Sequence, residues 1–250
     1  MKNRKIWVML VGLFTALTNG FMGTTLTFAE ENEASQTIEQ PSYISDFPNQ
    51  VGHWQDLVGT AEKKNDSAGL WIANTKQGTN LESVSINLDA REQSSGDLEL
   101  TFLYEGQSNF GLVFRGDKQK TSQWQSFAYN RDGRWQLGQP GGKWLTNIPG
   151  PTLLSGQQYK LLVRYDGKKI QTFLNDQLFY ENEEVHYPDG TSINDDWMGA
   201  VGIRLFGNLS KLNIISMKSG PVGSIPVIDS SAEYRELKEK WRNQLVSKEY

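Results

Sequence analysis

A two-residue Asp-Gly connection between two apolar runs constrains the fold of this chain more than any other feature. Residues 159–165 precede Asp166-Gly167, and residues 168–174 follow it. An Asp-Gly pair readily adopts the positive backbone φ angles of the tight turn that joins neighbouring antiparallel strands. The dipeptides Asn175-Asp176 and Asp132-Gly133 predict two further turns of this kind. The chain is therefore expected to build antiparallel sheets from hairpins.

Short runs rich in β-branched and aromatic residues recur along residues 51–218, and turn signals separate them every 8 to 12 residues or so. The expected strands are 69–74, 81–89, 97–104, 109–115, 123–130, 134–137, 157–165, 169–174, 177–180, 199–206 and 211–217. Leu98, Leu100 and Phe102 alternate with Glu99 and Thr101, which indicates a strand with one buried face. No convincing helical period precedes residue 229. The sequence predicts an all-β fold, an antiparallel jelly-roll sandwich over residues 51–218.

The amino terminus has the pattern of a secretory signal peptide over residues 1–29. Three basic residues precede an apolar run that ends at Thr27-Phe28-Ala29, with small residues at the expected cleavage site. An uncleaved membrane anchor is the alternative, because the run is long enough to span a bilayer. Residues 30–50 are polar and contain two prolines, so they are expected to form a linker. We expect a secreted, extracellular protein, and the absence of cysteine favours a Gram-positive bacterium.

The charge of the chain limits its partners. Cleavage after Ala29 removes three of the 25 Lys and Arg residues and none of the 29 Asp and Glu residues, which leaves a net charge of −7. A nucleic-acid partner is therefore not expected. With no cysteine, disulfides, zinc–thiolate sites and thiol nucleophiles are excluded. We expect a monomer without a membrane partner once the signal has been cleaved.

The chain ends with a predicted amphipathic helix over residues 230–250, after a Gly- and Pro-rich linker at 219–229. Ser230 and Glu233 form a capping box at its start. The apolar stripe consists of Tyr234, Leu237, Trp241 and Leu245. An isolated helix of this length is marginal in water, so the stripe needs a partner, either the sandwich or helices that this chain lacks. The Pro- and Gly-rich linker favours the second possibility.

Residues 97–217 resemble the concanavalin-like, laminin-G-type jelly rolls of bacterial carbohydrate enzymes, which include levan-binding and related carbohydrate-binding modules. The motifs that carry the resemblance are Phe110-Gly-Leu-Val-Phe-Arg115, Phe127-Ala-Tyr-Asn, Gly133-Arg-Trp, Tyr159-Lys-Leu-Leu-Val, Phe173-Leu-Asn-Asp-Gln-Leu-Phe and Gly199-Ala-Val-Gly-Ile-Arg. The resemblance implies a glycan ligand on the concave sheet or at loops along one edge, held by an Arg, an acid and an aromatic platform.

A second resemblance concerns the tail. Residues 234–245, Tyr-Arg-Glu-Leu-Lys-Glu-Lys-Trp-Arg-Asn-Gln-Leu, are similar to the opening helix of the α/α-toroid of polysaccharide lyase family 8, which includes hyaluronate lyases. The resemblance implies that residues 230–250 are the first helix of a truncated lyase domain. None of the catalytic residues of that family has a counterpart in this chain, so no catalytic residue is expected.

Basic and aromatic residues are interleaved in the segment 115–143, which carries six Lys and Arg residues against two Asp residues. Exposed aromatic rings bind the apolar faces of sugars, and Arg pairs with carboxylate or sulfate, so this segment predicts an extracellular polysaccharide, with an anionic one favoured. The candidate ligand-binding residues are Arg115, Trp124, Tyr129, Arg131, Arg134, Trp135, Trp144 and Trp197. Each tryptophan fits a core position equally well, and that alternative stays open.

One loop has the oxygen-rich composition of a calcium site, although its spacing matches no defined calcium loop. Its candidate ligands are Asp189, Asn194, Asp195 and Asp196, and an ordinary acidic turn is the alternative. No other cofactor is expected.

Two other functions stay open from the sequence. A small sandwich glycosidase or lyase could use Asp97 and Glu99 on one strand face, although the Glu-x-Asp-x-x-Glu pattern of sandwich glucanases is absent. A laminin-G-like adhesion domain that binds protein is the other alternative. The preferred prediction is a secreted carbohydrate-binding module, a non-catalytic fragment of a hyaluronate or polyuronate lyase.

Overall fold

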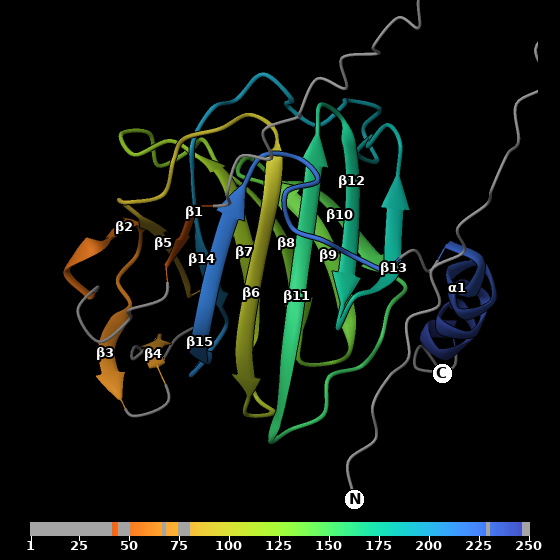
Figure 1. The fold of residues 1–250 in the computed structure, drawn as a ribbon, viewed down its shortest axis with the longest axis horizontal. Helices are drawn as coiled ribbons and strands as arrows, with labels where there is room; N and C mark the ends of the chain where they lie inside the picture. The colour runs from red at the N-terminus through yellow and green to blue at the C-terminus, as the bar shows by residue number, and fades with distance from the viewer. Residues whose placement is uncertain (1–41, 45–50, 67–68, 75–80, 229–230, 247–250) are drawn as a thin grey trace, which may run out of the picture. The chain divides into compact units, whose positions relative to one another are not determined.

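The computed structural model describes residues 42–44, 51–66, 69–74, 81–228 and 231–246. The predicted signal peptide and Ser230 lie outside these residues. Two antiparallel sheets face each other, and a helix lies beside one edge (Figure 1). The all-β sandwich predicted from the sequence is confirmed. None of the helices in these described ranges is long and apolar enough to cross a membrane.

Sheet A has the strand order β13-β12-β11-β6-β15-β4-β3, and β1 also pairs with β15. Its strands are β1 (Ser42–Ile44), β3 (Glu62–Asp66), β4 (Gly69–Ala73), β6 (Gly96–Tyr104), β11 (Gln157–Asp166), β12 (Lys169–Leu174), β13 (Gln177–Asn182) and β15 (Lys211–Gly220). The predicted linker at 30–50 therefore contributes a short strand, because β1 adds backbone pairing beside the end of β15.

Sheet B has the strand order β10-β9-β8-β7-β14-β5-β2. Its strands are β2 (Trp54–Val58), β5 (Glu82–Asn87), β7 (Asn109–Gly116), β8 (Gln125–Asn130), β9 (Arg134–Gln139), β10 (Lys143–Ile148) and β14 (Ala200–Phe206). A short 3-10 helix, η2 (Val51–His53), precedes β2, and α1 (Ser231–Val246) follows the sandwich. The sequence did not predict β2, β3 or β10, which all lie near the sheet edges.

The predicted hairpin turns are present. A tight turn joins β11 to β12 as predicted, but Asp166 pairs with Lys169, so its central residues are Gly167, with a φ of 54°, and Lys168, one residue later than predicted. Asn175 and Asp176 both have positive φ between β12 and β13. Leu98, Leu100 and Phe102 are fully buried and face the core between the sheets, which confirms the alternation of β6.

The predicted linker at 219–229 is docked on the sandwich over its described part. Residues 221–228, called the strap below, cross the outer face of sheet A from β15 toward α1 (Figure 1). The backbone N–H of Ile225 donates to Asp97 Oδ2 at 3.0 Å, and its carbonyl accepts from Arg164 Nη2 at 2.9 Å. Arg164 holds both oxygens of Asp97, at 2.7 and 2.8 Å. This buried pair fixes the strap to β6 and β11.

The stripe of α1 has its partner within this chain. Tyr234 and Trp241 are buried in the same cluster as the sandwich core. The Trp241 ring meets Phe179 of β13 edge-to-face, with 6.3 Å between the ring centroids. The expectation that the stripe requires helices absent from this chain was wrong for these two residues, because the edge of the sandwich offers them an apolar surface.

Candidate functional site

Arg115, the first predicted ligand residue, is a structural anchor. Its side chain is fully buried and donates to the carbonyls of Ser94, Gly167 and Asn194 at 2.6–2.9 Å and to Gln125 Oε1 at 2.9 Å. Burial lowers the pKa of this guanidinium, and the nearby Tyr165 hydroxyl is the largest opposing influence. Four segments are tied together by this one side chain, which leaves it no surface to offer a ligand.

Trp135 and Tyr129 lie in the core, the alternative that the sequence left open for each tryptophan. Their rings are 4.8 Å apart and buried to within 1%. Trp135 Nε1 donates to the Pro151 carbonyl at 3.0 Å, and the Tyr129 hydroxyl accepts from the Leu153 N–H at 3.1 Å. Burial raises the pKa of Tyr129. Both residues hold the loop at 149–153 against sheet B.

Three more of the predicted residues, Arg131, Arg134 and Trp197, lie nearer the surface, and the structure does not gather them into one site. Arg131 and Arg134 are at the turn between β8 and β9, where Arg134 Nε pairs with Asp132 Oδ2 at 2.9 Å. Trp197 is partly buried in the loop before β14.

The predicted calcium ligands are not assembled into a site. Asp189 Oδ1 accepts from the backbone N–H and the hydroxyl of Thr191, at 2.9 and 2.6 Å, which lowers the pKa of the Asp189 carboxyl. The Asn194 carbonyl accepts from Arg115 and Gln125. Among the residues that the structure describes, no group of three or more His, Cys, Asp and Glu side chains could hold a metal ion. Asp189 and Asn194 are thus engaged by Thr191, Arg115 and Gln125.

Trp124 and Trp144 are brought together, on the outer face of sheet B. Their ring centroids are 6.2 Å apart, and Arg204 of β14 lies against both, 4.2 Å from the Trp144 centroid and 5.5 Å from the Trp124 centroid. The Phe206 ring is 4.2 Å from the same guanidinium. Trp124 is buried, whereas Trp144 and Phe206 keep part of their surface exposed. Two partly exposed rings are thus held on one cation.

Arg204 positions an acid as well as the rings. Its Nε donates to Glu82 Oε1 at 2.5 Å, and the Glu82 side chain is 31% exposed while that of Arg204 is 9% exposed. Burial lowers the pKa of Arg204, and Glu82 opposes that shift. The Arg204 Nη1 atom is buried without a hydrogen-bond partner among the described residues. A guanidinium so enclosed orients its neighbours, and Glu82 is the group that reaches solvent.

Small residues make room for this arrangement. A Cβ atom at Gly138 would lie 2.1 Å from Trp144 Cε3, so the indole rests directly on the backbone of β9. Gly202 lies beside Arg204 on β14, where a Cβ atom would be 2.2 Å from the Ser85 carbonyl oxygen. Trp144 can lie flat only because β9 has no side chain at this position.

A hollow with a volume of about 450 Å³ adjoins Glu82 and Trp124, within the usual range of about 300–1,000 Å³ for small-ligand pockets. It is lined by Leu57, Val58, Gly59, Glu82, Thr121, Ser122, Trp124 and Pro140. We call this hollow, with Trp144, Arg204 and Phe206 beside it, the sheet B groove. It combines apolar walls, aromatic rings, two hydroxyls and one oriented carboxylate.

Arg204 was not among the residues predicted from the sequence, although a signal was present. Val201, Ile203 and Leu205 face the core, so the alternation of β14 places Arg204 and Phe206 on the opposite face. Glu82, directly across from Phe206 in the register of β5 and β14, had no such local signal.

The fold defines the class of this protein as a galectin-like or concanavalin-like β-sandwich. No protein-family model matches the chain. A protein of unknown function with a galectin-like fold from Bacillus subtilis is similar in structure, with a TM-score of 0.54 and 13% identity over 72% of this chain and 96% of that one. An endo-β-galactosidase from Clostridium perfringens that releases GlcNAcα1-4Gal gives a TM-score of 0.50 and 11% identity over 75% and 64%. The carbohydrate-binding module CBM66 from Bacillus subtilis gives 0.46 and 16% over 64% and 94%.

Proposed function

We propose that this protein is a secreted, non-catalytic carbohydrate-binding domain whose ligand contacts the sheet B groove. The observation that carries the proposal is the stack of Trp144 and Phe206 on the buried Arg204, with Glu82 oriented toward solvent. Partly exposed rings bind the apolar faces of pyranose or furanose units, and a fixed carboxylate accepts hydrogen bonds from two neighbouring hydroxyls. The CBM66 module and the endo-β-galactosidase are named for carbohydrate binding and cleavage, which agrees with this proposal.

A neutral glycan fits this surface better than the anionic one that the sequence favoured. The basic residues of the segment 115–143 are largely paired: Arg115 is buried, Lys118 pairs with Glu92, Lys120 with Asp117, and Arg134 with Asp132. Glu82, which pairs with the buried Arg204, is the charged side chain in the lining of the hollow. Local basicity is therefore much weaker than the composition of the segment implied, and an acidic polymer would meet a carboxylate.

Retention in native gels that contain a soluble polysaccharide tests the proposal. The gels contain β-1,3-1,4-glucan, xylan, galactomannan, inulin or hyaluronan. Trp144→Ala is expected to weaken retention on at least one neutral polymer by about tenfold or more, because it removes the platform. Trp197→Ala, which alters a partly buried tryptophan of another loop, is the matched control. Equal loss from both variants, or retention on hyaluronan alone, would contradict the proposed site.

The two acids considered for catalysis are engaged elsewhere. Asp97 is bound by Arg164 and the strap, and Glu99 lies 3.3 Å from Lys218 Nζ with 6% of its side chain exposed. Both acids are therefore held by partners within the fold, and this geometry does not favour glycoside hydrolysis by Asp97 and Glu99. Incubation of the purified chain with the same polymers, followed by a reducing-end assay, checks this point, and released ends would refute a purely binding role.

The proposed secretion and lyase origin rest on residues 1–29 and on the tail resemblance alone. Mass spectrometry of the protein exported by its host tests the first, since cleavage after Ala29 fixes the expected mass. The docking of α1 on β13 gives the tail a role without a toroid. A coding segment for a helical lyase domain downstream of residue 250 would support the lyase origin.

A further inference from the structure

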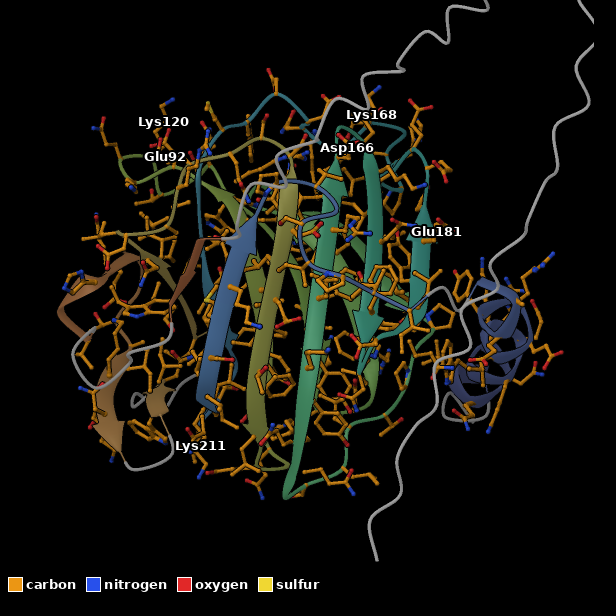
Figure 2. The ribbon with its side chains drawn as sticks, viewed as in Figure 1. Glu92, Lys120, Asp166, Lys168, Glu181 and Lys211 are labelled. Carbon is orange, nitrogen blue, oxygen red and sulfur yellow. The ribbon has the colours of Figure 1, made fainter. Side chains whose placement is uncertain are left out.

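A second hollow, with a volume of about 570 Å³, lies on the outer side of sheet A. Its lining includes Trp71 of β4, Asn74, Glu105, Gln107, Leu209 and Lys211. Figure 2 shows Lys211, at the start of β15, at the end of the sandwich opposite Lys120. We call this hollow the Trp71 site.

Trp71 is directed away from the core. Its neighbours Leu70 and Ile72 are fully buried between the sheets, so the alternation of β4 places the indole on the outer face of sheet A, where it is partly exposed. Lys64 of β3 lies across from it in the register, and its Nζ is 4.1 Å from the ring centroid. Ala73, two residues along the same face, has no bulk to fill the space beside the ring.

The opposite wall of the hollow is formed by the turn between β14 and β15. Leu209 has a φ of 55°, a left-handed conformation that non-glycine residues rarely adopt, and its side chain is 55% exposed. The turn is held by the Ser210 hydroxyl, which donates to the Phe206 carbonyl at 2.6 Å and accepts from the Asn109 N–H at 3.2 Å. An apolar side chain is thus presented to solvent on a rigid turn, at a conformational cost of about 1 kcal/mol or more.

The charged groups that line the hollow balance each other, and Lys64 on the Trp71 ring lies outside this lining. Lys211 and Glu105 form an ion pair with each other, and both line the hollow together with the neutral amide of Gln107. Glu105 accepts hydrogen bonds, Lys211 donates them, and Gln107 does both. These groups suit a ligand with many hydroxyls and no net charge, and Trp71 with Leu209 suits its apolar face.

We propose that the Trp71 site is a second carbohydrate-binding site, which takes a neutral saccharide unit stacked on Trp71. The site shares no lining residue with the sheet B groove, so the proposal stands on its own observations. With both sites working, one domain binds a long polymer at two points. Simultaneous engagement raises the apparent affinity by about 10²–10⁴ over a single site.

The experiment compares Trp71→Ala, Trp144→Ala and the double variant in gels that contain the same neutral polysaccharides. Gln158→Ala, an exposed position on the outer face of sheet A, is the matched control. Trp71→Ala is expected to weaken retention on the retained polymer by about tenfold or more, and the double variant to abolish it. In calorimetric titration with a hexasaccharide of that polymer, the intact chain is expected to bind two equivalents and Trp71→Ala one.

Glu105→Gln keeps the shape of the site and provides a second test should Trp71→Ala unfold the chain. It is expected to weaken retention while leaving the thermal midpoint within about 2 °C, since an exposed ion pair contributes little to stability. Unchanged retention of both Trp71→Ala and Glu105→Gln, or failure of the intact chain to bind any neutral polymer, would overturn the proposal. Loss from Trp71→Ala with none from Trp144→Ala would refute the sheet B groove and leave the Trp71 site standing.

Discussion

Replacing Trp241 by alanine should release α1 from the sandwich. The indole is 7% exposed and packs edge-to-face on Phe179, and Tyr234 is the other buried ring of the helix. Burying a tryptophan removes about 150–250 Å² from water, which corresponds to about 4–6 kcal/mol, and measured Trp→Ala losses are about 3–5 kcal/mol. A 16-residue helix is marginal in water by itself. One ring cannot hold it, so we expect local undocking and unfolding of α1.

The assay separates this local event from unfolding of the sandwich. In Trp241→Ala, ellipticity at 222 nm should fall by the share of one helix, and trypsin should cleave at the basic residues of α1 while the sandwich stays intact. The exposed neighbour Lys240→Ala is the matched control, because it lies in the same helix and removes no buried surface. The main thermal transition should persist in both variants.

The reasoning fails if Trp241→Ala keeps the helical signal and the protease resistance of the parent chain. That result would mean that the docking of α1 does not depend on its apolar stripe. A loss of the whole β-sandwich transition would also contradict it, because the helix would then be a required part of the core rather than an edge attachment.

Three further predictions follow from single contacts. Asp97→Asn leaves the Arg164 guanidinium partly buried beside a neutral group. The free energy of unfolding, measured in urea, should therefore fall by about 3–5 kcal/mol. A change below about 1 kcal/mol would contradict a structural role for the pair. Gly138→Ala places a Cβ atom 2.1 Å from the Trp144 ring, so retention on a neutral polysaccharide should weaken while far-UV circular dichroism is unchanged; unaltered retention would speak against the sheet B groove. Two buried tyrosines, Tyr165 and Tyr180, should destabilise the fold in alkali, because burial raises the pKa of each to about 12 in the folded chain. In the unfolded chain they ionise from about pH 10, so above that pH the free energy of unfolding should fall by about 1.4 kcal/mol per pH unit for each. Urea titrations at pH 9, 10 and 11 that show no decline in this free energy would refute the prediction.

The features that were predictable from the sequence are those that local geometry determines. The hairpin turn at Gly167 and the alternation of Leu98, Leu100 and Phe102 depend on neighbours within a few residues, and both are present in the structure, the turn one residue later than predicted. The edge strand β3 gave no apolar signal, because its sequence Glu-Lys-Lys-Asn-Asp contains no residue that a core requires. Its pairing with β4 provides its order instead.

The role of each tryptophan could not be predicted, because strand alternation tells which residues share a face but not which face is covered. Trp135 points between the sheets, Trp144 lies outside on Gly138, and Trp124 is outside yet buried beneath its own loop. That last arrangement requires Trp124 to pack with Val84 and Ile86, which are distant in sequence. Only tertiary contacts distinguish the three.

Arg115, the candidate chosen from the sequence, and Arg204, which was not chosen, are both buried, but only Arg204 lies on the outer face of its sheet. Arg204 lies in a regular part of β14, so alternation with Ile203 and Leu205 places it on the outer face with an acid and aromatic rings. Arg115 has a φ of 55°, and the register between β7 and β14 shifts between Ala200 and Gly202. This bulge reorients the strand, so that the guanidinium lies 5.3 Å from the Tyr165 ring and binds backbone carbonyls. A motif of residue types does not record a bulge. An arginine at the end of a strand is therefore weaker evidence for a ligand site than one in its regular middle, where the direction of the side chain follows from its neighbours.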